Sequence, residues 1–247
     1  MVPTEFSLEL VVARHEEDLR WLRRVPQSLA ITLYDKGAGR PSLPEEVQAR
    51  NGFQRRCLPN VGREAHSYLT HLVENYENLS AVTVFCQGHP FDHAPDFHER
   101  LRLLAGGGEC PDPFLWYGFL DETDDPCGRR IFVPWSKNPE RRELHTGLLY
   151  ELLFEEASPK WFCFRGGAQF AVTREAVQRR SREFYERALV LMQEIPESAH
   201  SLERMWDRFF GEPMIDPVDL GSDGVRYWKR IRRLEVMGAG KGIPTSE

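Results

Sequence analysis

Three short runs of apolar and β-branched residues stand out in the first hundred positions. They cover residues 8–13 (LELVVA), 30–34 (AITLY) and 82–86 (VTVFC). Short apolar runs bounded by polar or turn residues are typical of strands that are buried on both faces of a sheet. We therefore predict three buried strands, and a fourth at 161–164 or 169–172, beside the Gly-Gly pair at 166–167.

Apolar residues at steps of three and four predict the helices. The clearest stripe consists of Ala65, Tyr68, Leu69, Leu72, Val73 and Tyr76. It indicates an amphipathic helix with Asn60 as its N-cap. The same spacing predicts a helix over 19–25 that Pro26 ends and a short helix within 44–50. Two further helices are expected over 174–195 and 202–210.

This alternation of strands and helices favours one α/β domain over residues 1–225. Its mainly parallel sheet would be flanked by helices in a Rossmann-like arrangement, with a helical C-terminal third. Residues 105–160 show no clear pattern, so a lid and a rigid insert both remain open. The basic segment 226–247 is expected to be a partly flexible tail.

Composition narrows the possible classes. The 247 residues are 41% hydrophobic and 28% charged, with a net charge of −6, so we expect a globular protein that does not bind nucleic acid through general basicity. Five cysteines without a C-x-x-C pair argue against a disulfide framework and a structural zinc site. We expect a cytoplasmic protein, because the cysteines are predicted to be free thiols and the chain has neither a membrane-length apolar run nor a signal-peptide pattern.

Ligands of open α/β sheets bind at the carboxyl ends of the strands. Three segments follow the predicted strands, at 14–18, 35–39 and 87–96, and the helix start at 60–64 can join them. A helix start offers free N–H groups to an anion such as a diphosphate. Arg63 is unfavourable there unless an anion offsets it. That anion is either a ligand or, as the commoner alternative, Glu64 or another surface acid.

The loop over 87–96 and the residue that soon follows it are rich in metal-ligand and acid–base side chains, namely His89, Asp92, His93, Asp96 and His98. Imidazole and carboxylate can hold a divalent metal, and histidine is the usual general base near neutral pH. Pro90 prevents a helical His pair of the zincin type. The alternative is a polar loop whose side chains bond to one another and to turn amides.

An acidic run and the lack of several known motifs limit the kinds of enzyme that the sequence suggests. The acidic run at 121–125 (DETDD) is either a site for Mg²⁺ or Mn²⁺ or, more commonly, an acidic surface turn. The chain has no G-x-G-x-x-G, Walker A, G-x-S-x-G or H-E-x-x-H sequence. Kinases, P-loop NTPases, α/β-hydrolases and zincins are therefore disfavoured.

Several blocks of sequence resemble a known but uncharacterised family. They are LVVARHEEDLRWL, then NVGREAHSYLTHLVENYENLSAVTVFCQGHPFDH, then FRGGAQFAVTREAV and FYERAL. In this order they resemble the family called domain of unknown function 3431, over roughly residues 8–211. The family name carries no settled activity.

A more distant likeness concerns nucleotide-sugar glycosyltransferases of the GT-A type. Their rhamnan-synthesis branch carries an Asn-x-Gly-Arg-Asp motif, which is similar to Asn60, Gly62, Arg63 and Glu64 here. The likeness implies a GT-A-like fold that transfers a sugar from a nucleotide-diphosphate donor to an unknown acceptor. GT-A enzymes usually carry Asp-x-Asp after the third strand, where this chain has Gln87-Gly88-His89.

The resemblance implies a role for each candidate residue. The base and ribose of the donor would lie against Ala13, Arg14, Asp35 and Lys36, and its diphosphate or ribose against Asn60 and Arg63. Gly62 and Glu64, in the same segment, are also expected in the donor site. A metal, Mn²⁺ or Mg²⁺, or the leaving group would be oriented by His89, Asp92 and His93. Glu203 is the candidate for deprotonating the acceptor, with a surface residue as the commoner alternative. The alternatives are a non-catalytic nucleotide- or sugar-binding module and a His/Asp metal-dependent hydrolase.

Overall fold

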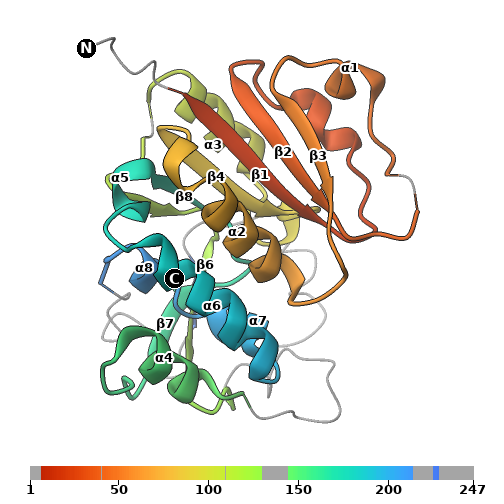
Figure 1. The fold of residues 1–247 in the computed structure, drawn as a ribbon. Coiled ribbons are helices and arrows are strands. Elements are labelled where there is room, and N and C mark those ends of the chain that lie inside the picture. The colour runs from red at the N-terminus through yellow and green to blue at the C-terminus, as the bar shows by residue number, and fades with distance from the viewer. Residues whose placement is uncertain (1–6, 40, 109, 130–143, 214–224, 228–247) are drawn as a thin grey trace, which may run out of the picture.

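A six-stranded sheet forms the centre of the molecule. The computed structural model describes residues 7–39, 41–108, 110–129, 144–213 and 225–227. Within them the sheet has the strand order β3-β2-β1-β4-β8-β5 (Figure 1). These strands are β1 (Leu8–Arg14), β2 (Leu29–Asp35), β3 (Phe53–Cys57), β4 (Val82–Gln87), β5 (Phe114–Trp116) and β8 (Phe170–Thr173).

The strand directions bring the carboxyl ends of four strands to one edge of the sheet. Strand β1 pairs in parallel with β2 and β4, and β2 pairs in parallel with β3, whereas β8 runs antiparallel to β4 and β5. The register sets Ala13 opposite Gln87 and Arg14 opposite Asp35. The polar segments that follow β1, β2 and β4 therefore begin side by side, which confirms the predicted mainly parallel α/β sheet.

Helices cover both faces of the sheet because successive side chains of a strand point to opposite sides. Val11 and Ala13 of β1 face a core shared with α2 (Arg63–Glu74), α6 (Arg182–Glu194), α7 (Ser198–Glu203) and α8 (Trp206–Phe209). Leu10 and Val12 face η1 (Arg20–Arg24) and α3 (Phe97–Ala105). Figure 1 shows α2 in front of the sheet and α3 behind it.

A second, three-stranded sheet lies below the first, with the order β7-β6-β9 (Figure 1). It consists of β6 (Leu120–Asp124), β7 (Phe162–Arg165) and β9 (Val225–Tyr227), and α4 (Thr146–Phe154) lies near it. The acidic run expected as a surface turn or metal site is largely strand β6. Asp121 accepts from Arg165 Nε at 2.8 Å and Asp124 from Arg204 Nε at 2.7 Å, and both aspartates are buried.

The structure corrects several predicted elements. The predicted helix over 174–195 is two helices, α5 (Arg174–Val177) and α6, because the backbone is extended at Ser181. The helix over 202–210 is likewise divided into the end of α7 and α8. Both alternatives for the fourth strand are strands, β7 and β8, and the helix over 19–25 is the 3-10 helix η1. Strand β3 was not expected, because its side chains are mostly polar and exposed.

Two smaller predictions fit the structure. A short helix, α1 (Glu45–Gln48), lies where one was expected, and no disulfide joins the five cysteines, all of which the structure describes. In the part of the chain that the structure describes, helices are too short or too polar to cross a membrane. Of the predicted tail over 226–247, only the first two residues, in β9, are described, and the rest lies outside the described residues.

Candidate functional site

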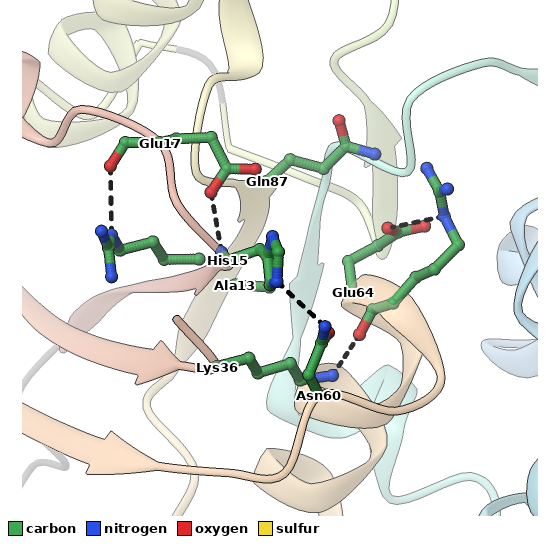
Figure 2. A pocket seen from close by; sticks show the side chains of 9 residues that line it. Ala13, His15, Glu17, Lys36, Asn60, Glu64 and Gln87 are labelled. Atoms are coloured by element: carbon green, nitrogen blue, oxygen red, sulfur yellow. Dashed lines mark hydrogen bonds and ion pairs between the residues drawn. The ribbon is translucent and has the colours of Figure 1, made fainter. Parts of the chain in front are cut away.

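A cavity of about 300 Å³, called here the strand-end cavity, opens where the parallel strands β1, β2 and β4 end. Figure 2 shows side chains from the end of β1, the loop after β2, the start of α2 and the end of β4 around it. The residues that line it are Ala13, Arg14, His15, Glu17, Lys36, Asn60, Arg63, Glu64 and Gln87. Six of the predicted donor-binding residues are among them: Ala13, Arg14, Lys36, Asn60, Arg63 and Glu64.

The loops around this cavity are tied together by short contacts. Glu17 Oε2 accepts the backbone N–H of His15 at 2.7 Å, which fixes the turn after β1. Asn60 Nδ2 lies 2.9 Å from His15 Nε2 and joins this turn to the segment before α2 (Figure 2). A Cβ added at Gly37 would overlap the carbonyl oxygen of His15, so the loop after β2 reaches its place only with glycine there.

Asp35 supports the cavity from beneath instead of lining it. Arg14 Nη1 donates to its Oδ1 at 2.6 Å, Arg55 Nη2 donates to its Oδ2 at 2.7 Å, and the Gly37 amide adds a third bond. Its side chain is 1% exposed. Both carboxylate oxygens are therefore already engaged. The expected contact of Asp35 with a ribose has no support in this geometry, and the residue clamps the ends of β1 and β2 instead.

Helix α2 begins later than the sequence predicted. Its N-cap is Gly62, at a left-handed φ of 59°, and Asn60 lies outside the helix. Arg63, the first helical residue, also has a positive φ, 46°. Lys36 Nζ donates to the carbonyls of Val61, at 2.7 Å, and Arg63, and so holds this turn (Figure 2). Gly62 has no side chain that could cap the helix, and Arg63 and Glu64, in the first turn, line the cavity.

Arg63 has an exposed guanidinium, with 56% of its side chain accessible. Its Nε lies 3.7 Å from Glu64 Oε2, beyond hydrogen-bond distance. Glu64 therefore offsets the charge of Arg63 only through a weak, partly exposed ion pair. The Arg63 guanidinium remains accessible to a ligand.

Burial shifts the pKa values of two residues that line the cavity, Glu64 and Lys36. Burial, and next the charge of Glu203, raise the pKa of Glu64 to about 7. Burial lowers the pKa of Lys36 to about 8, although Glu64 opposes this shift. Near neutral pH the cavity therefore combines the charged Arg63, a mostly charged Lys36 and a partly protonated Glu64. Such a combination favours an anionic ligand.

Glu203 lies at the end of α7, where its Oε1 accepts the backbone N–H of Gly167 at 2.5 Å. Burial alone would raise the pKa of Glu203, but Arg204, the Gly167 amide and His93 lower it below its usual range. The carboxylate is therefore charged near neutral pH. Its charge in turn raises the pKa of Glu64, which links the last turn of α7 to the first turn of α2.

The histidine-rich segment does not converge on one point. His89 Nδ1 lies 3.5 Å from Asp92 Oδ2, and both side chains are about half exposed. His93 instead lies against Gly167, where an added Cβ would overlap its side chain. His98 faces away, with Nε2 3.1 Å from the carbonyl of Trp21. Among the described residues, no group of three or more His, Cys, Asp or Glu side chains is arranged to hold a metal ion.

For three lining residues the sequence predicted no ligand-binding role: His15, Glu17 and Gln87. Each lies within a segment that was expected at a strand end, so strand position was the available signal. Their individual roles depend on contacts between distant segments, such as His15 with Asn60, and no local pattern encodes such contacts.

Comparison with known proteins gives a family and little else. A family model described as "Protein of unknown function (DUF3431)" matches residues 10–103 and 122–219. No curated protein matches the chain. One similar solved structure is a CMP:2-keto-3-deoxy-manno-octonic acid synthetase complexed with CTP. It has 13% identity and a TM-score of 0.34, over 76% of this chain and 84% of that one.

Proposed function

The chain belongs to the DUF3431 family, whose description states no activity, and we propose from the geometry of its site that it is a nucleotide-sugar-dependent glycosyltransferase. The observation that carries this proposal is the strand-end cavity. It combines the start of α2, three cationic side chains and two amide side chains at the carboxyl ends of β1, β2 and β4. That combination suits the diphosphate of a sugar nucleotide.

The donor would lie across the strand ends. Its diphosphate meets the first N–H groups of α2, with Arg63 on the exposed side and Lys36 beneath the turn. Asn60 and Ala13 are left for the ribose or base, and Arg14, engaged with Asp35, shapes this part of the cavity. Asp35 is assigned no donor contact.

The reaction breaks the bond between the anomeric carbon and the diphosphate oxygen, and the electron pair leaves with the nucleoside diphosphate. The acceptor oxygen forms the new bond and loses its proton. Glu203, charged and next to the Gly167 amide, is the proposed proton acceptor. Arg63 and the α2 start stabilise the developing charge on the leaving diphosphate.

Binding of a divalent cation, Mn²⁺ or Mg²⁺, stays a prediction, and the arrangement of the side chains gives it little support. The proposed ligands His89, Asp92 and His93 do not meet at one point, and Gln87 stands where GT-A enzymes usually carry an acidic residue. No step of the proposed reaction is assigned to a metal. His89, Asp92 and His93 likewise keep their proposed role at the leaving group only as a prediction.

Gln87 also favours a second candidate, a non-catalytic module that binds a nucleotide or sugar in the same cavity. The two candidates differ in turnover. We expect the wild-type chain, mixed with UDP-, GDP- or CDP-sugars, to release nucleoside diphosphate slowly by hydrolysis of one donor, with and without Mn²⁺. Arg63→Ala should reduce this release at least tenfold, whereas Arg182→Ala, a half-exposed arginine on α6, should not.

Binding of a sugar nucleotide with no release, even after long incubation and with alcohols added, would instead support the non-catalytic module. Failure of every nucleotide and every sugar tested to bind would contradict both candidates.

A further inference from the structure

A second cavity, called here the α6–α7 cavity, lies on the other side of the segment that precedes α2. Its volume is about 730 Å³. Arg63 lines both cavities, so they adjoin at this residue. Most of the other residues that line the α6–α7 cavity are apolar: Pro59, Val61, Met192, Ile195, Pro196 and Ala199.

This cavity is formed by a fixed turn. Ser198 Oγ donates to the carbonyl of Met192 at 2.6 Å and holds the junction of α6 and α7. A Cβ added at Gly62 would overlap Met192 Sδ, so the segment before α2 packs closely on the end of α6. Glu197, at this junction, has a positive φ of 57°. A non-glycine residue in that conformation is strained and persists only where surrounding contacts enforce it.

The polar end of the α6–α7 cavity contains Arg63, which also lines the proposed donor site, and His200. His200 lines the cavity, and its Nε2 lies 3.8 Å from Glu197 Oε2. Burial first, and the charge of Arg63 next, lower the pKa of His200, whereas Glu203 opposes this shift. His200 lines the same cavity as Arg63 and precedes Glu203 by three residues on α7, and its lowered pKa leaves it neutral near pH 7. A neutral imidazole can accept or donate a hydrogen bond to a hydroxyl group.

We infer that the α6–α7 cavity binds the acceptor, and that the acceptor is an amphipathic alcohol with an apolar body and a hydroxylated head. This inference rests on the proposed function. The apolar body packs against Val61, Met192 and Ile195. The head lies at Arg63 and His200, next to the donor in the strand-end cavity. A fully polar sugar would leave the apolar lining in contact with water, and a purely apolar molecule would bring no hydroxyl to Glu203.

The test uses n-octyl β-D-glucoside below its micellar concentration, with glucose as the probe that lacks an apolar body. Val61 is 44% exposed, and Val190, on α6 outside the cavity lining, is 53% exposed. Val61→Asp and Val190→Asp are therefore matched variants. We expect octyl glucoside to bind the wild type and Val190→Asp equally, and Val61→Asp at least tenfold more weakly, in calorimetric titration. Glucose should show no measurable binding.

Equal binding of octyl glucoside to all three proteins, or none to the wild type, would overturn the inference. So would a wild-type dimer that Val61→Asp converts to a monomer in sedimentation, because a second copy would then occupy the cavity. Titration of the wild type with UDP, GDP and CDP in the same buffer keeps the two proposals separate. If a nucleoside diphosphate binds but octyl glucoside does not show the expected pattern, only the acceptor site is contradicted. If no nucleoside diphosphate binds, the donor site is contradicted.

Discussion

Two neighbouring residues at the start of α2 are costly to the folded state. Arg63 has a positive φ, and Glu64 is a buried carboxyl whose pKa burial and Glu203 raise to about 7. Both costs occur at the edge of the strand-end cavity, where a bound anion would interact with the helix start. Strained backbone and perturbed acids are concentrated at functional sites, which agrees with the proposed role of this turn.

Replacing Glu64 by Gln should stabilise the protein above pH 7. The folded-state pKa lies above the unfolded value of about 4.5, so the native state binds more protons between these values and loses stability as pH rises. We expect a gain of about 1–3 kcal/mol at pH 8 that shrinks toward pH 4. Urea unfolding at both pH values measures it, with Glu74→Gln on the same helix as the control. A gain that does not depend on pH would contradict this account.

Replacing Arg63 by Gly or by Ala separates strain from charge. Glycine accepts a positive φ freely, whereas alanine keeps the strain, so the glycine variant should be more stable than the alanine variant by about 1 kcal/mol. Both lack the guanidinium and should bind nucleoside diphosphate at least tenfold more weakly than the wild type. Denaturant unfolding and calorimetry measure the two effects. Equal stability of the variants would argue against strain.

At this scale the sequence predicted the residues of the Asn60–Glu64 segment, since they are neighbours in the chain. The roles that it assigned to Asn60, in that segment, and to Asp35, at the end of β2, were incorrect or incomplete. Asn60 bonds His15 and does not cap α2, and Asp35 is held by Arg14 and Arg55 beneath the cavity. Both roles depend on partners about 20 or more positions away, which spacing along the chain does not show.

At the scale of elements, the cavity depends on how closely the loops after β1 and β2 approach each other. Gly37→Ala places a methyl group on the carbonyl of His15, so the loops must separate. We expect a loss of about 1–3 kcal/mol in unfolding free energy, together with loss of nucleoside diphosphate binding. Gly39 has open space around it, and Gly39→Ala is the control. A Gly37 variant that is as stable as the control would contradict this close approach.

The buried strands β1, β2 and β4 were predicted because apolar runs bounded by polar residues identify strands that are covered on both faces. Strand β3 was missed for the opposite reason: FQRRC is an edge strand that is mostly exposed and carries Arg55 to Asp35. The breaks at Ser181 and before Trp206 were missed because the apolar stripe continues through them. Tertiary packing of α5, α6, α7 and α8 on one core decides where they end.

The whole molecule brings the first turn of α2 and the last turn of α7 together, although about 140 residues separate them in the sequence. The sequence could not predict this, nor the second sheet, in which Asp121 and Asp124 are buried against arginines. The acidic run at 121–125 is typical of a surface turn when it is considered alone. Its partners, Arg165 and Arg204, lie some 40 and 80 positions further along the chain.

The charges of the whole site predict proton uptake on ligand binding. Burial holds the pKa of Lys36 at about 8, and a bound diphosphate would raise it, so binding at pH 8 should take up protons. Affinity should therefore fall as pH rises from 7 to 9. Titrations in buffers of different ionisation enthalpy measure the uptake. Affinity that rises over this range would contradict the placement of the diphosphate beside Lys36.

The most direct test of the account is calorimetric titration of the wild type and Arg63→Ala with UDP, GDP, CDP and ADP. The account predicts one site per chain for at least one of them, with a dissociation constant in the micromolar range. It predicts at least tenfold weaker binding to Arg63→Ala and unchanged binding to Arg182→Ala. No binding at millimolar concentration, or equal binding to Arg63→Ala, would contradict a diphosphate site at the start of α2.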